Sequence, residues 1–133
     1  MNRRCSSNFT PPAPMIAVVV GVPGGTEERQ IDGKIDSGAD ICALPEDLIV
    51  ELDLAPVRSV RAAGFGQPLQ DVLLYHCALR FAGHEFAHVE ALAIRRAYPL
   101  IGRSVLRHLV VRLDGPKRML TITSGRPTRG RRR

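Results

Sequence analysis

The hydrophobic and polar positions of this chain predict β-strands along most of its length. Residues 15–22 are apolar throughout and rich in β-branched side chains, as in a strand buried on both faces. Over residues 28–35 the pattern changes to alternation, with Ile31, Gly33 and Ile35 on one face. A Pro-Gly-Gly turn separates the two segments, so the sequence begins its structured part with a predicted hairpin.

The rest of the chain continues this pattern of short strands and turn-rich borders. A short helix opened by Pro and two acidic residues is expected over 45–52. Further strands are expected at 41–44, at 57–62, as two long strands between 72 and 94, and as a final hairpin of 110–113 with 119–122. A flexible arm is predicted for residues 1–14 and a basic, disordered tail for residues 124–133. One domain is therefore expected over residues 15–123.

The candidate chemistry lies at Asp36-Ser37-Gly38, directly after the predicted strand 28–35. In such a turn the Gly38 backbone N–H and the Ser37 hydroxyl can fix the carboxylate oxygens before substrate arrives. Peptide hydrolysis by carboxylates needs two of them sharing a proton, one acting on water as base and the other on the carbonyl as acid. The Asp-Gly pairs at positions 32 and 114 lack the hydroxyl residue, so the second carboxylate has to come from a second copy.

Two motifs together indicate a family. Asp36-Ser37-Gly38-Ala39-Asp40, followed by Pro99-Leu100-Ile101-Gly102-Arg103-Ser104-Val105-Leu106, resembles the retropepsin family of aspartic peptidases over about residues 15–122. The resemblance implies an all-β acid protease barrel with a strand over 98–102 and one short helix over 104–109. It also implies a homodimeric aspartic endopeptidase with one catalytic Asp per subunit, which acts on protein or peptide substrates and needs no cofactor or metal.

The same resemblance implies roles for individual residues. Asp36, Ser37 and Gly38 form the catalytic turn, and Ser37 stands where the family usually has Thr and braces the turn between subunits. Gly102 allows close backbone approach, and Arg103 pairs with Asp40 to hold the dimer near the active site. The substrate-binding residues implied are Ala39, Asp40, Ala63, Gly64, Phe65, Gly66 and Ile101.

A glycine-flanked aromatic residue at 63–68 predicts a mobile hairpin tip. The resemblance makes this segment a flap that closes over an extended peptide and excludes water. Gln67 and Pro68 follow Gly66, whereas the family's tip usually has adjacent glycines. An ordinary β-hairpin turn fits the same residues.

Composition narrows the class further. At 133 residues the chain is long enough for one domain and too short for two lobes, which makes the dimer a requirement of the interpretation. Three cysteines without CxxC spacing favour a reduced, cytoplasmic protein and argue against a zinc site. The pattern around His76, His84 and His88 favours solvent-facing side chains over metal ligands.

The formal net charge of +6 is concentrated in arginines near the end of the chain. We interpret this Arg-rich tail as solvated, with contact to nucleic acid or acidic lipid as the alternative. The alternative to the peptidase as a whole is a catalytically silent dimeric module of the same fold that binds peptides or supports assembly. A scaffold has no physical need for the Asp36 carboxylate at its interface, which favours the peptidase.

Overall fold

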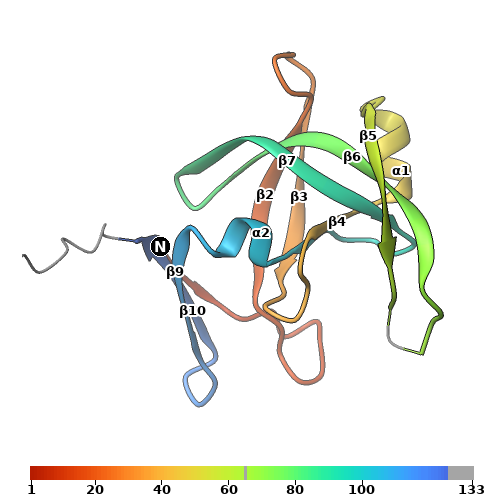
Figure 1. Cartoon of the computed structure of the whole chain (residues 1–133). Helices are drawn as coiled ribbons and strands as arrows, with labels where there is room; N and C mark the ends of the chain where they lie inside the picture. The colour runs from red at the N-terminus through yellow and green to blue at the C-terminus, as the bar shows by residue number, and fades with distance from the viewer. Residues whose placement is uncertain (65, 126–133) are drawn as a thin grey trace, which may run out of the picture.

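The computed structural model describes residues 1–64 and 66–125 (Figure 1). No helix among these residues is long and apolar enough to cross a membrane. The elements in chain order are β1 (Asn2–Arg4), β2 (Met15–Gly21), β3 (Glu28–Ile35), β4 (Cys42–Pro45), α1 (Glu46–Glu51), β5 (Pro56–Ala62), β6 (Gln70–Phe81), β7 (His84–Ile94), β8 (Leu100–Ile101), α2 (Arg103–Leu106), β9 (Leu109–Asp114) and β10 (Met119–Ser124).

Most strands belong to a sheet that closes on itself. Its order is β2-β3-β8-β4-β7-β6-β5, and an additional pairing of β2 with β6 joins Val19–Gly21 to Ala78–Arg80. The pairs β3–β8 and β4–β7 are parallel, and the other pairs are antiparallel. The result is an all-β barrel with a buried interior formed by alternate side chains. Strand β5 pairs with the first half of the long strand β6, on the same edge that β2 joins further along.

The predicted hairpin of the first two long strands is confirmed. β2 has mostly buried side chains, and β3 buries Gly33 and Ile35 while its other face stays open. The long strands β6 and β7 also follow their predicted alternation, because Cys77, Leu79 and Phe81 are buried. The last helix is shorter than the predicted 104–109, since α2 ends at Leu106.

The expectation of a flexible arm over 1–14 is wrong. Asn2–Arg4 forms strand β1, which pairs with β10 in a second sheet of order β1-β10-β9. The Cys5 N–H donates to the Arg118 carbonyl at 2.8 Å, and Ala13 is buried against the domain. The tail boundary at 124 also shifts, because Ser124 is the last residue of β10. Residues 126–133, which hold the Arg-rich segment, lie outside the described part of the chain.

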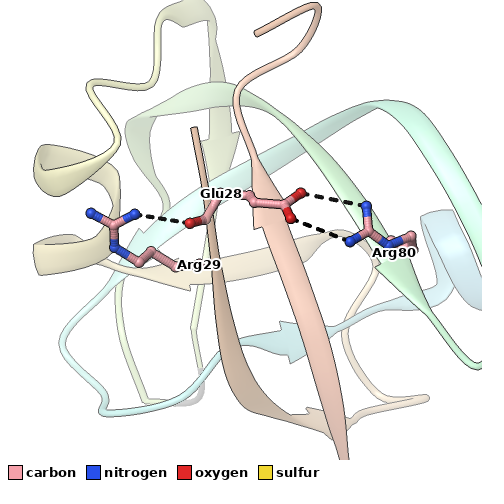
Figure 2. Close-up of polar contacts among 3 residues, drawn as sticks. All are labelled: Glu28, Arg29 and Arg80. Atoms are coloured by element: carbon pink, nitrogen blue, oxygen red, sulfur yellow. Dashed lines mark hydrogen bonds and ion pairs between the residues drawn. The ribbon is translucent and has the colours of Figure 1, made fainter. Parts of the chain in front are cut away.

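Ion pairs fasten the turn end of the β2–β3 hairpin to its neighbours (Figure 2). The Glu28 carboxylate accepts from both Arg80 terminal nitrogens at 3.4 Å, and its carbonyl accepts from Arg29 Nη1 at 2.9 Å. Arg29 Nε also donates to Glu51 at the end of α1 at 2.6 Å. The hairpin is therefore held to β6 on one side and to α1 on the other. Because these side chains are about half exposed, each pair contributes little to stability.

Two of the three cysteines are fully buried, and this predicts their reactivity. Burial raises the pKa of Cys42, and burial together with the neighbouring Cys42 raises the pKa of Cys77 from 9.0 to about 12. At pH 8 the Cys77 thiolate fraction is then about 1000-fold lower than that of an ordinary thiol. We expect a thiol reagent to label only Cys5 in the folded protein and all three cysteines after denaturation. In Cys5→Ser, rapid labelling of any thiol before unfolding would contradict this.

Candidate active site

The Asp36 turn is fixed by backbone contacts at the end of β3. Ile35 pairs with Ile101 in the parallel β3–β8 ladder, and the Asp36 N–H donates to the Ile101 carbonyl at 3.0 Å. The Gly38 N–H donates to Asp36 Oδ1 at 3.0 Å, as the sequence predicts. The hydrogen bonds of the described residues include none from the Ser37 hydroxyl to Asp36, so the carboxylate is oriented by backbone alone.

The Ile101-Gly102-Arg103 segment packs directly behind this turn. A Cβ on Gly102 would lie 2.5 Å from the Ile41 carbonyl oxygen and 2.9 Å from that of Ala39. The Arg103 N–H donates to the Ala39 carbonyl at 2.8 Å, and the Ser104 N–H donates to that of Asp40 at 3.0 Å. Only glycine allows the two segments to approach this closely, and the contact positions the turn.

Asp40 and Arg103 form the ion pair that the motif predicts. Arg103 Nη2 donates to Asp40 Oδ1, and both side chains are largely exposed. An exposed pair of this kind stabilises the fold only slightly. The pair connects the end of the Asp36 turn to the beginning of α2. Because it is exposed beside the cleft, it is also accessible to another chain.

The turn separates two hollows of the surface. On one side Gly38, Ala39 and Asp40 line a cavity of about 510 Å³ below the β5–β6 hairpin, which we call the cleft. On the other side Ser37 lines an apolar groove of about 440 Å³ against β9, which we call the β9 groove. Figure 1 shows the β5–β6 and β9–β10 hairpins on opposite sides of the molecule. Ser37 and Gly38 follow one another in the turn, yet they line two different hollows of the surface.

The predicted substrate-binding residues are only partly brought together. Ala63 lines the cleft with Ala39 and Asp40, whereas Gly64 and Gly66 lie at the exposed hairpin tip. Phe65 lies outside the described residues. The expectation for Ile101 is wrong, because its side chain is fully buried in the core. In the two-residue strand β8 neighbouring side chains point to opposite faces, so Leu100 lines the cleft instead.

Sequence reasoning missed much of the apolar wall of the cleft. Leu74 of β6, together with Leu92 and Ile94 of β7, completes this wall beside Val60 of β5. Residues 92 and 94 share one face by alternation, but only the strand order shows that this face meets β5 and the turn. A cavity of this size with small and branched apolar walls suits an apolar side chain of a bound peptide.

An ion pair holds β5 over the cleft. Arg58 Nε and Nη2 both donate to Glu90 Oε2, at 2.9 and 2.7 Å. The hydrogen bond from Arg58 lowers the pKa of Glu90, so this carboxylate stays ionised to a lower pH than an ordinary Glu. The connection between β5 and β7 consequently persists in mildly acidic solution and is lost only as the pH falls through the lowered value.

The histidines on the outer surface form a pair. His76 Nε2 and His88 Nδ1 are 3.0 Å apart across β6 and β7, and both side chains are at least partly exposed. Among residues 1–64 and 66–125, no three His, Cys, Asp or Glu side chains are grouped to hold a metal ion. His84 lies apart from the pair, at the first residue of β7.

Solved structures with the same arrangement identify the fold. Over 92% of its length the chain matches 88% of a retropepsin-like aspartic protease from Rickettsia conorii, with a TM-score of 0.62 and 15% identity. It also matches the simian foamy virus (mac) protease, over 71% of this chain and 92% of that one, with a TM-score of 0.54 and 20% identity. The chain has the retropepsin fold. A third such neighbour of this retropepsin-like chain is the EIAV protease complexed with the inhibitor HBY-793, with a TM-score of 0.53, 16% identity, and coverage of 71% of this chain and 86% of that one.

The structural neighbours agree with the resemblance that the two sequence motifs indicate, whereas comparison of the whole sequence finds no relative. No family model matches the sequence, and no curated protein matches it. At 15 to 20% identity, the likeness to these solved structures concerns the course of the chain and the position of its turns. Any statement about activity therefore depends on the residues of this chain at the Asp36 turn.

Proposed function

We propose that this protein is an aspartic endopeptidase that works as a homodimer, with one Asp36 from each subunit. The observation that carries the proposal is the Asp36 carboxylate, held by the Gly38 N–H beside an apolar cleft at the end of β3 in a retropepsin-like barrel. The described part of the chain has no second Asp-Ser/Thr-Gly turn. A second carboxylate must come from a second subunit.

The chemistry follows from bringing the two carboxylates together about a two-fold axis. Carboxylates at contact distance repel each other when both are ionised, so the pair retains one shared proton. The ionised member takes a proton from a bound water, and this water attacks the peptide carbonyl while the protonated member donates to the carbonyl oxygen. The resulting tetrahedral intermediate collapses when the leaving amine is protonated. Such a pair works best in mildly acidic to near-neutral solution.

The residues that line the cleft indicate which peptides the proposed enzyme would cleave. The walls formed by Val60, Leu74 and Leu92 suit an apolar side chain close to the bond that is cut. Strand β5 above the cleft carries the backbone groups that an extended peptide requires as hydrogen-bond partners. We expect extended peptide segments with an apolar residue next to the cleaved bond to be preferred.

Cleavage of a mixed peptide library, measured as a function of protein concentration, tests the proposal. Between about pH 4 and about pH 7 the protein is expected to cleave peptides, and its specific activity is expected to fall on dilution as dimers dissociate. Mass spectrometry of the products gives the preference around the cut. A stable dimer that binds peptides and cleaves none would contradict the proposal and favour the silent peptide-binding module.

A further inference from the structure

Two histidines face one another on the outer surface of the β6–β7 hairpin. His76 Nε2 and His88 Nδ1 are 3.0 Å apart, and the two ring planes differ by only 22° with their centroids 5.1 Å apart. The rings therefore approach edge to edge, nitrogen to nitrogen. In a hydrogen bond of this kind one ring donates its N–H to the bare nitrogen of the other.

The pairing of β6 with β7 brings these side chains together, although they are 12 residues apart in the sequence. The register shifts between Cys77 and Leu79, and His88 is one of the β7 residues opposite this β-bulge. A bulge increases the local twist and redirects side chains. His76 lies opposite Glu90, two residues along β7 from His88, so the two histidines are diagonal neighbours on one face of the sheet.

The spacing of the two nitrogens is that of a chelating pair. Metal–nitrogen bonds of about 2.05 Å at an angle of about 90° place two neighbouring ligand nitrogens about 2.9 Å apart, and a tetrahedral angle places them about 3.3 Å apart. The observed 3.0 Å is closer to the first value. It favours an ion with square-planar or octahedral geometry, such as Cu²⁺ or Ni²⁺. Because the χ2 torsion of His is broad, small rotations of the rings can aim both lone pairs at the ion.

A hollow beside the pair has room for the rest of a coordination shell. It has a volume of about 280 Å³ and is lined by His88 and Glu90, with Arg58 and His108 also on its wall. Both hydrogen bonds from Arg58 go to Glu90 Oε2, so Oε1 accepts none among the hydrogen bonds of the described residues. This oxygen is available to accept from a metal-bound water, and outer partners of this kind strengthen metal sites. The Glu90 charge also offsets that of Arg58 next to the ion.

We propose that His76 and His88 together bind one divalent transition-metal ion, with water in its remaining positions. The ion takes the place of the hydrogen bond between the rings. Each ring binds through the nitrogen at the gap and keeps its proton on the other nitrogen. Neither histidine lines the cleft or the β9 groove, so the site is separate from the Asp36 turn and does not depend on the proposed peptidase.

Titration with Ni²⁺, followed by isothermal titration calorimetry, tests the site. A Cys5→Ser background removes the partly exposed thiol as a competing ligand. At about pH 7.5, where protons compete little for imidazole nitrogens, this protein is expected to bind one Ni²⁺ ion per chain. His76→Gln and His88→Gln are each expected to weaken binding by about tenfold or more, because loss of even an outer partner of a metal ligand costs that much.

The other two histidines of the chain are the matched controls. His84 is the first residue of β7, and His108 follows α2. His84→Gln and His108→Gln are expected to bind Ni²⁺ as the background protein does. The second control is the stricter one, because His108 lines the same hollow as His88. A His108→Gln variant that loses binding as the pair variants do would overturn the assignment to two histidines.

Thermal unfolding tests whether the ion binds the folded hairpin. A ligand that binds only the native state raises the Tm. Excess Ni²⁺ is expected to raise the Tm of the background protein and of His84→Gln by several degrees, and to leave that of His76→Gln and His88→Gln unchanged. Circular dichroism before heating confirms that each variant is folded. An equal rise in all four proteins would place the ion elsewhere and overturn the proposal.

The outcomes are independent of the proposed peptidase activity. Binding of Ni²⁺ that is lost in both pair variants and kept in both controls supports the site, whether or not the protein cleaves peptides. A background protein that binds no Ni²⁺ up to about 1 mM would overturn the site, and so would binding that both pair variants retain. Either of these results leaves the peptidase proposal as it stands.

Discussion

Asp36→Asn is expected to abolish peptide cleavage while the protein remains folded and dimeric. The amide keeps the shape of the side chain and can still accept the Gly38 N–H, but it cannot take a proton from water. Loss of the base from both subunits is expected to lower kcat/KM by about 1000-fold or more. The measurement is cleavage of the best library peptide, beside sedimentation and circular dichroism of the variant.

The matched control for this prediction is Asp32→Asn. Asp32 belongs to β3, the strand that ends just before Asp36, but its side chain is exposed and makes only a loose ion pair with Arg3 at 3.7 Å. This variant is expected to cleave as the parent does. Cleavage by Asp36→Asn at a rate near that of the parent would rule out the carboxylate mechanism.

Mixing the two proteins tests whether both subunits contribute. If one Asp36 comes from each chain, a parent subunit paired with an Asp36→Asn subunit has a single carboxylate and is inactive. With a ninefold excess of the variant and full exchange, only about a tenth of the parent chains find a parent partner, so activity is expected to fall roughly tenfold. Activity that is unaffected by the excess would show that each chain acts alone.

Gly102→Ala is expected to cause a large loss of stability. The added Cβ would lie 2.5 Å from the Ile41 carbonyl oxygen and 2.6 Å from its carbon, and these are backbone atoms that cannot rotate away. Separating the two segments breaks the contacts that Arg103 and Ser104 make to the Asp36 turn. We expect the free energy of unfolding to fall by about 3 kcal/mol. Urea denaturation followed by circular dichroism measures it.

Gly115→Ala is the control for steric crowding as such. Gly115 lies in the β9–β10 turn, and a Cβ there meets no atom within 4 Å. This substitution is expected to leave stability within about 0.5 kcal/mol of the parent. Equal stability of Gly102→Ala and the parent would show that the two segments behind the turn can separate without cost.

The barrel strands could be predicted because their alternation is imposed by burial. One face of β6 is buried at Cys77, Leu79 and Phe81, and the same period appears in the sequence. The Asp36 turn could be found for a similar local reason, since the carboxylate and the glycine that binds it are two residues apart. The close approach at Gly102 was also expected, because the motif places a glycine where two backbones meet.

Features that depend on pairing across the chain could not be predicted in this way. Strand β1 has polar side chains without alternation, and it is held by backbone hydrogen bonds to β10, more than a hundred residues away. Ile101 and Leu100 are both apolar, and only the direction of β8 decides which of them lines the cleft.

The Asp36 turn has the cleft on one side and the β9 groove on the other. In the proposed homodimer one Asp36 from each subunit meets at the two-fold axis, so a peptide in the cleft and the partner subunit are expected to contact the same turn. Free-energy linkage is reciprocal, so dimerisation raises the affinity for peptide by the same factor by which peptide strengthens the dimer. At low protein concentration the substrate is then expected to promote assembly of the proposed enzyme, and we expect the rate to depend on peptide concentration in a sigmoidal manner.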